Sequence, residues 1–392
     1  MKKILFFTHV STLGGAGLCL YHLVLAVKKK AVPVVVLMQE GPLATLLREQ
    51  DIKVYIEPRI CPLMSNTNST ALWRNPVAFA GLLHMRRSIR LAQQYCSKES
   101  PDVVHLNTTV LMHLAKGARS AGVNKIILHM REHWNVSKWD PRGWVGNTIV
   151  KKYVDRIIAI SQTAAERFGF LEKTDVVYDW PDFSGRDGKI DPLREWGVGP
   201  DKKILLVPGG RTSIKGSVVA MRAMSQVKDA NAVMLVLGGR SDTNPKKELI
   251  RKVLRMLHQE TYGLMLDRLE NESNGRIIML PPVKQILSLI QQSEIIISPF
   301  IVPHFSMPSV EGGLLGKPVI LSDDGHARET VVDQKTGFII PAGDVEVLAA
   351  SINDLLAHPE KAAAFGKAGF SHVSSLADKK RNGSSLVELL IS

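Results

Sequence analysis

Short apolar runs rich in β-branched residues recur along the chain and alternate with stretches of helical pattern. Residues 3–9, 33–38 and 203–207 are runs of this kind. They lack the polar alternation of a half-exposed strand, so they are typical of strands buried on both faces of a parallel sheet. Parallel strands need long crossovers, and the intervening helical segments supply them. The pattern predicts an α/β fold with doubly wound parallel sheets.

The alternation occurs twice, and a proline- and glycine-rich stretch over 179–200 separates the two series. We therefore expect a first Rossmann-like domain at 1–180 and a second at 181–370. A helical segment at 371–392 is expected to pack back on the first domain. Ligands of open α/β sheets bind beyond the carboxyl ends of the strands. Two such domains are thus expected to face each other across a cleft that holds the site.

Composition excludes several classes of protein. With 392 residues, 45% apolar and 22% charged, the chain is neither disordered nor a coiled coil. The three cysteines, Cys19, Cys61 and Cys96, form no CxxC pair, which argues against a disulfide scaffold or a structural zinc site. We expect a cytoplasmic protein without a membrane-spanning helix. The opening residues MKKILFFTHV are interpreted as a first strand rather than a signal peptide.

Positive charge is concentrated in the first half of the chain. Residues 1–180 hold 24 Lys and Arg against 13 Asp and Glu, which favours an anionic partner. Within 59–90, aromatic and apolar side chains accompany arginines, namely Trp73, Phe79, Leu82 and Leu83 with Arg74, Arg86, Arg87 and Arg90. This mixture suits the inner face of an anionic membrane and a lipid-linked acceptor. An amphipathic helix packed on its own domain is the alternative. No nucleic-acid motif is present, so nucleic acid is not an expected partner.

Several motifs of the second half occur in a fixed order. They are GGRTSIKG, LVLGGR, MPSVEGG, GKPVILSD and TGFIIPAGD. The first half adds GGAG, VVHLN, HMRE and DRIIAISQ. In this combination the chain resembles the retaining glycosyltransferase family 4, the glycosyl transferases group 1, which have a two-domain GT-B fold. The resemblance implies that a sugar moves from a nucleotide sugar to an acceptor with retention at the anomeric carbon and without a bound metal or cofactor.

The resemblance also implies roles for residues of the second domain. Glu311 matches the Glu that holds the donor's ribose, and a carboxylate can accept two charge-assisted hydrogen bonds. Arg211 and Lys215 match the cations that neutralise the donor's phosphates, although the family's Lys usually lies one residue further on. Ser309 and Val310 would offer N–H groups to the diphosphate at a helix N-terminus. The alternatives are a first-turn carboxylate, solvated surface cations and an ordinary capped helix.

Other donor-side positions follow from the same resemblance. Gly15 and Ala16 belong to a glycine turn that the family places beside the sugar and diphosphate; a tight turn without ligand contact is the alternative. The family's first Glu falls, by its usual spacing, at Pro303, which has no carboxylate. The adjacent residues His304, Phe305 and Ser306 are expected to replace part of its contacts.

Polar residues that end strands of the first domain are expected on the acceptor side. They are His105, Asn107, Arg131, Glu132 and His133. Arg131 stands where many family members carry a His, and we interpret it with Glu132 as an acceptor or phosphate contact rather than a base. In a front-face mechanism the leaving phosphate takes the acceptor proton, so a base is not required. A buried ion pair that organises the loop is the alternative.

The sequence thus predicts a retaining hexosyltransferase. The expected donor is a UDP-sugar, and the expected acceptor is a glycan or lipid-linked saccharide in envelope polysaccharide assembly of the lipopolysaccharide type. Two other functions stay open. One is a non-catalytic nucleotide-sugar-binding subunit, which would bind a donor without turnover. The other is a nucleotide-sugar epimerase of the same fold, which the absence of paired catalytic carboxylates disfavours.

Overall fold

The residues of the chain fall into two units. The computed structural model describes residues 1–63, 76–131, 141–181, 196–238, 261–281, 283, 286–302, 305–323, 325 and 327–392. Contacts between Cα atoms group Met1–Trp180 with Asp378–Ser392 as unit 1, and Pro181–Ala377 as unit 2. The chain therefore crosses between the units twice, at 180/181 and at 377/378.

Unit 1 is built on a seven-stranded sheet in the order β3-β2-β1-β4-β5-β6-β7. Every neighbouring pair of strands is parallel. The strands are β1 (Lys3–Thr8), β2 (Val32–Leu37), β3 (Lys53–Ile56), β4 (Val103–Leu106), β5 (Lys125–Met130), β6 (Arg156–Ala159) and β7 (Thr174–Val176). The apolar side chains of β1, β4 and β5 are fully buried, which confirms the prediction of a parallel sheet covered on both faces.

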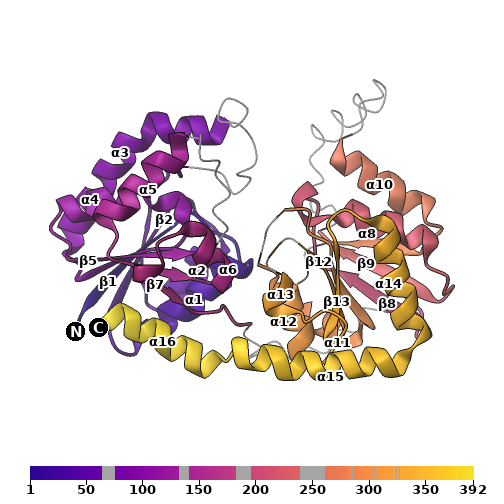
Figure 1. Ribbon diagram of the computed structural model, residues 1–392. Helices are drawn as coiled ribbons and strands as arrows, with labels where there is room; N and C mark the ends of the chain where they lie inside the picture. The colour runs from indigo at the N-terminus through magenta and orange to yellow at the C-terminus, as the bar shows by residue number, and fades with distance from the viewer. Residues whose placement is uncertain are drawn as a thin grey trace. The chain divides into compact units, whose positions relative to one another are not determined.

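Helices cover both faces of this sheet. Those of unit 1 are α1 (Gly15–Lys28), α2 (Pro42–Glu49), α3 (Pro76–Glu99), α4 (Leu114–Ser120), α5 (Pro141–Tyr153), α6 (Gln162–Phe168) and α16 (Lys379–Ile391), with short 3₁₀ turns η2 (Thr109–Leu111) and η3 (Leu171–Lys173). Figure 1 shows α3, α4 and α5 together on one face of the sheet, whereas α1 and α16 lie on the other.

Unit 2 has a six-stranded parallel sheet in the order β10-β9-β8-β11-β12-β13. Its strands are β8 (Lys203–Val207), β9 (Ala232–Leu237), β10 (Ile277–Leu280), β11 (Ile295–Ser298), β12 (Val319–Asp323) and β13 (Gly337–Pro341). The helical elements are η4 (Ser213–Lys215), α8 (Ser217–Ala223), η5 (Met224–Gln226), α10 (Tyr262–Glu272), α11 (Ile286–Gln292), α12 (Met307–Leu314), α13 (Ala327–Thr330), α14 (Val345–Ala357) and α15 (Pro359–Leu376).

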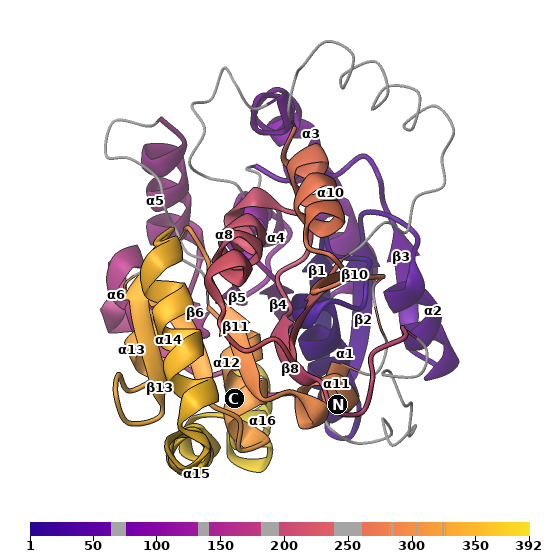
Figure 2. The same cartoon turned by 90° about the vertical axis from the view of Figure 1, so that its right-hand side faces the viewer.

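Packing contacts divide these helices into two layers. Helices α10 and α14 pack against α8, whereas α11 and α15 pack against α12. Figure 2 shows α8 and α10 side by side. Helix α8 is short and continues directly into the tighter turn η5.

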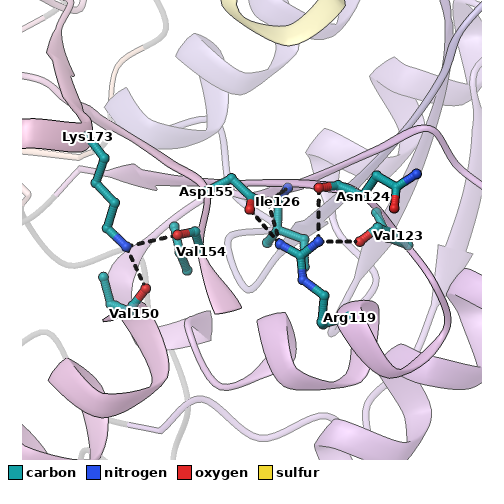
Figure 3. A network of polar contacts seen from close by, with 8 residues as sticks. All are labelled: Arg119, Val123, Asn124, Ile126, Val150, Val154, Asp155 and Lys173. Atoms are coloured by element: carbon teal, nitrogen blue, oxygen red, sulfur yellow. Dashed lines mark hydrogen bonds and ion pairs between the residues drawn. The ribbon is translucent and has the colours of Figure 1, made fainter. Parts of the chain in front are cut away.

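A polar network ties the amino-terminal ends of β5 and β6 to the adjacent helices (Figure 3). The Arg119 guanidinium donates to the carbonyls of Val123 and Asn124, both at 2.9 Å, and to both oxygens of Asp155, each at 2.6 Å. Asp155 in turn accepts the Ile126 N–H at 2.7 Å. Val123 and Asn124 lie in the turn between α4 and β5, so Arg119 joins this turn to the residue that precedes β6.

Helix α16 is fixed to unit 1 at the point where the chain first leaves it. The Asn382 side-chain amide donates to the Tyr178 carbonyl at 3.0 Å. A Cβ at Gly383 would lie 3.5 Å from the Trp180 ring, so the glycine lets the indole lie close to the helix. Both crossings of the chain are thus held at one place on unit 1. In the described part of the chain, no helix is both long and apolar enough to span a bilayer.

Candidate functional site

Each sheet has one place, its switch point, where the order of its strands reverses. In unit 2 the chain moves outward from β8 to β9 and β10, and then resumes on the other side of β8 with β11. The loops after β8 and β11 therefore begin side by side at the carboxyl edge. This is where ligands of open α/β sheets bind. The corresponding place in unit 1 lies between β1 and β4.

The loop after β8 is held close to the next strand by glycines. Gly210 has φ +74°, and Gly238, directly after β9, has φ +93°. A Cβ at Gly238 would lie 2.5 Å from the Gly210 Cα, so only glycine fits there. The Ser217 hydroxyl at the start of α8 donates to the Gly210 carbonyl at 2.7 Å. These contacts define the path of the segment that carries Arg211.

Lys215 lies where the two loops meet. Its turn ends at Gly216, with φ +69°, and a Cβ there would lie 1.7 Å from the Pro299 carbonyl oxygen. The Ile301 N–H donates to the Ile214 carbonyl at 3.1 Å and joins the loops directly. The Lys215 ammonium stands 4.5 Å from the centre of the Phe300 ring. Burial lowers the pKa of Lys215 to about 8.

Arg211 is held by helix α10. Its Nη2 donates to Asp267 Oδ1 and to the Gly263 carbonyl, each at 2.8 Å. The Tyr262 hydroxyl accepts the Val218 N–H of α8 at 3.2 Å. The motifs of the sequence do not indicate this contribution of α10. The available signal was Asp267 itself, an acidic residue on the helix face that also buries Leu264 and Leu266.

Helix α12 begins with a complete side-chain cap. The Ser306 hydroxyl accepts the Ser309 N–H at 3.2 Å and lies 3.0 Å from the hydroxyl of Ser298, which ends β11. The Ser309 hydroxyl bonds to the Ser306 carbonyl and to Thr330. The Val310 N–H donates to the Ser306 carbonyl at 3.4 Å. Both N–H groups expected to face a diphosphate are therefore used within the cap.

Glu311 is the fifth residue of α12 and is half-buried. The alternative of a first-turn carboxylate is therefore wrong, because Ser306 is the N-cap and the first turn, which begins at Met307, holds no acidic residue. Phe305, expected beside the donor, is 6% exposed and belongs to the interior of unit 2. Pro303 and His304 lie outside the described residues.

In unit 1 the glycine turn leads directly into α1. Gly14 is the N-cap, so no side chain caps the helix. Gly15 is exposed and Ala16 is half-buried. The first turn of α1 holds no acidic residue, so its free N–H groups form an electropositive end. A Cβ at Gly17 would lie 2.0 Å from the Thr12 carbonyl oxygen, so the close approach that requires glycine is at Gly17.

Two buried histidines lie on β4 and β5 of unit 1, the strands that follow its switch point. His105 Nε2 and His129 Nδ1 are 3.2 Å apart, and neither side chain is exposed. Burial, and next the charge of Arg131, lowers the pKa of His105 to about 3. The same causes lower the pKa of His129 well below its usual range. Both imidazoles are therefore neutral at physiological pH.

Arg131 joins three chain segments in the interior. Its Nη1 donates to Asp179 at 2.6 Å and its Nε to Asn107 Oδ1 at 2.7 Å, and its side chain is 2% exposed. Asn107 in turn donates to Thr8 at 3.3 Å. The residues His105, Asn107 and Arg131 do come together at the strand ends, but as a buried network. The alternative of a buried ion pair describes Arg131 correctly. Glu132 and His133 lie outside the described residues.

Comparison with known proteins shows what unit 2 is similar to. Residues 192–372 match the model of the family described as glycosyl transferases group 1. A GDP-mannose-dependent α-(1-6)-phosphatidylinositol monomannoside mannosyltransferase of Mycolicibacterium smegmatis is 38% identical over 81 residues, 21% of each chain. A D-inositol 3-phosphate glycosyltransferase of Segniliparus rotundus is 26% identical over 227 residues, 56% of this chain and 48% of the relative. The chain thus matches between a fifth and a half of the length of these relatives.

A solved structure is similar over both units. The Anabaena protein HepE, solved in complex with UDP and glucose, has a TM-score of 0.75 and 22% identity, covering 100% of this chain and 99% of that one. The predicted fold class, α/β with two Rossmann-like domains of the GT-B type, is therefore confirmed. The resemblance to the group 1 glycosyltransferases is confirmed as well.

The close approach at Gly216 leads to a first prediction. Gly216→Ala places a methyl group against the Pro299 carbonyl, whereas Gly275→Ala has a similar φ of +79° and no neighbour within 4 Å. The control substitution should cost about 1–2 kcal/mol for the left-handed backbone alone. Gly216→Ala should cost about 2 kcal/mol more, because backbone must move. Urea unfolding of the two variants measures the difference, and equal losses would contradict the packing described.

Proposed function

Because residues 192–372 match the model of the glycosyl transferases group 1, we propose that the protein transfers a sugar from a nucleotide sugar to an acceptor with retention at the anomeric carbon. One observation carries this proposal. The two cations Arg211 and Lys215 lie at the switch point of unit 2, on a loop that is bonded to the segment leading into the Glu311 helix. Such an arrangement suits a ligand that carries a diphosphate next to a ribose.

The cations would act on the leaving group. As the bond between the anomeric carbon and the phosphate oxygen breaks, negative charge grows on the nucleoside diphosphate. Arg211 and Lys215 would stabilise that charge in the transition state. They would supply the positive charge that a metal ion supplies in other transferases, and we propose no cofactor. Glu311 would accept hydrogen bonds from the ribose hydroxyls and fix the nucleotide.

The acceptor would attack from the face that the phosphate leaves. Its oxygen forms the new bond to the anomeric carbon, and its proton passes to the departing phosphate oxygen, so that no protein base is needed. The neutral His105–His129 pair and the buried Arg131 would support the loops of unit 1 rather than contact the acceptor, because none of them reaches the surface. The exposed Gly15 turn would border the donor.

The finer proposal names a UDP-sugar as donor and a glycan or lipid-linked saccharide of envelope polysaccharide assembly as acceptor. HepE binds UDP in its solved complex, which supports the donor base. The mannosyltransferase relative is named for GDP-mannose and for a phosphatidylinositol mannoside, which supports a lipid-linked acceptor. The same name is a reason to test GDP-sugars as well. Work on such an acceptor would place the protein at the inner face of the cytoplasmic membrane.

The surface of α3 supports this membrane contact. Leu83 is 65% exposed, and the exposed Arg86, Arg87 and Arg90 share its helix face by their spacing. Leu82, by contrast, packs against the core of unit 1. The acidic residue of α3 is Glu99, which is 4% exposed in an ion pair with Lys53, and α4 and α5 contain no acidic residue. Trp73 and Arg74 lie outside the described residues, and nothing is described of the Phe79 side chain.

A donor screen tests the proposed function. UDP-, GDP- and ADP-sugars would be compared by thermal shift and by slow donor hydrolysis with the full chain, with Glu311→Ala and Glu311→Gln. One donor should stabilise the protein. Glu311→Ala should lower the affinity for that donor about a hundredfold, because two charge-assisted hydrogen bonds are lost. Glu311→Gln should lose less. Glu346→Ala, an exposed residue of α14, is the matched control.

The other outcomes of the screen discriminate the alternatives. Stabilisation by a donor without hydrolysis or transfer would favour the non-catalytic binding subunit. Conversion of the donor to an epimeric sugar would identify an epimerase. No stabilisation by any donor would contradict the assignment of Glu311 and of the whole site.

The lowered pKa of Lys215 predicts a pH dependence of donor binding. The ammonium binds phosphate only while charged, and it loses its proton as the pH rises through about 8. UDP affinity should therefore fall above about pH 8, approaching tenfold per pH unit. Lys215→Arg should remove this dependence, because a guanidinium stays charged throughout the range. Calorimetric titration between pH 7 and 9.5 measures both, and a flat profile in the wild type would contradict the role of Lys215.

The basic face of α3 predicts binding to anionic vesicles. Replacing Arg86, Arg87 and Arg90 together by Glu should weaken sedimentation with phosphatidylglycerol vesicles more than tenfold, at about 1 kcal/mol per cation. The control is Lys202, Lys335 and Lys367 of unit 2, all exposed, replaced in the same way with the same change in net charge. Equal losses in the two triple variants, or equal binding to neutral vesicles, would argue against a specific surface.

A further inference from the structure

Helix α10 places an anionic side chain, that of Asp267, against Arg211. We infer that Asp267 is a positioning residue for Arg211. Its carboxylate and the Gly263 carbonyl together hold one nitrogen of the guanidinium and leave the remaining nitrogens for the diphosphate of the donor. This inference rests on the proposed function, and it adds the element that prepares one of the two cations.

The hydrogen bonds of Arg211 carry the first step of the argument. Among the described residues, all of them leave from Nη2, which meets Asp267 Oδ1 and the Gly263 carbonyl oxygen, each at 2.8 Å. A guanidinium has five N–H donors in a rigid fork. With Nη2 held by two acceptors, its plane is set while Nη1 and Nε keep their donors for another anion. A phosphate can therefore bind without displacing Asp267.

The burial of the pair carries the second step. The Asp267 side chain is 10% exposed and that of Arg211 is 19% exposed. A long arginine side chain loses conformational freedom when it binds a ligand. Because Asp267 restrains Arg211 in advance, part of this loss is met during folding rather than during donor binding. Prior restraint of this kind favours catalysis when the held group must meet a developing charge.

The rest of the α10 N-terminus carries the third step. Gly263 has no side chain, and a Cβ there would lie 3.2 Å from Arg211 Nη2, which leaves little room for a larger residue. The adjacent Tyr262 accepts the Val218 N–H at the start of α8, directly after the loop of Lys215. Thr261 caps the helix through the Leu264 N–H. One turn of α10 thus braces the segments that carry both cations.

A double-mutant cycle tests the inference. Asp267→Ala, Asp267→Asn, Arg211→Ala and Asp267→Ala/Arg211→Ala would be titrated in the full chain with UDP, GDP and uridine. Asp267→Ala should lower the affinity for the nucleoside diphosphate about tenfold, which lies within the range of coupling energies between residues in contact. Uridine affinity should not change, because uridine has no phosphate. Asp267→Asn should retain most of the affinity, since its amide oxygen can still accept from Nη2. In the Arg211→Ala background, removal of Asp267 should have no further effect.

Three outcomes would overturn the inference. An equal loss for uridine and UDP would indicate that Asp267 merely supports the fold. An undiminished loss in the Arg211→Ala background would show that Asp267 acts independently of Arg211. Tighter UDP binding by Asp267→Ala would mean that the carboxylate competes with the donor. Failure of the proposed function is seen separately, because the wild type would then bind none of the nucleotide sugars in the donor screen.

Discussion

Parallel strands cannot be joined by hairpins, and this constraint underlies the rest of the structure. Every strand in either sheet returns through a crossover, so all carboxyl ends lie at one edge. Where strand order reverses, two loops begin as neighbours without being neighbours in sequence. That reversal brings the Lys215 turn against Pro299 and Ile301, and places Asn107 beside Thr8 in unit 1. The order of the strands thus determines which polar residues of each unit are neighbours.

The cations gathered in this way are kept in different environments. Lys215 is largely desolvated beside an aromatic ring, so its pKa falls to about 8 and it is charged at neutral pH but loses its proton at mildly alkaline pH. Arg211 is compensated by a carboxylate and a carbonyl, and its charge is permanent. Arg131 of unit 1 is fully enclosed, and its charge serves to join β4, β5 and the segment that leaves the sheet. The three cations therefore differ in their burial and in the acceptors that hold them.

The sequence predicts the strands well, because a buried parallel strand needs an unbroken apolar run and few other elements do. The family motifs also locate Arg211, Lys215 and Glu311 on the correct elements. Burial is harder to predict: His105, Asn107 and Arg131 end strands as expected, yet all are enclosed by later segments. Partners distant in sequence, Asp179 for Arg131 and Asp267 for Arg211, could not be predicted, because tertiary packing alone brings each pair together. The cap of α12 at Ser306 likewise depends on tertiary packing, since its hydroxyl also lies 3.0 Å from that of Ser298.

Helix α16 has a consequence for the order in which the chain can fold. It packs on α1 and buries Leu386, Val387 and Leu390, yet it follows unit 2 in the sequence. Unit 2 is one uninterrupted stretch and can reach its final form as soon as it has been synthesised. Unit 1 is begun earlier but cannot be completed until unit 2 and then α16 have been synthesised. Until then the side of α1 that packs against α16 is uncovered. The first half of the chain to be made is therefore the last to be finished, and it is the half that a chaperone would have to shield.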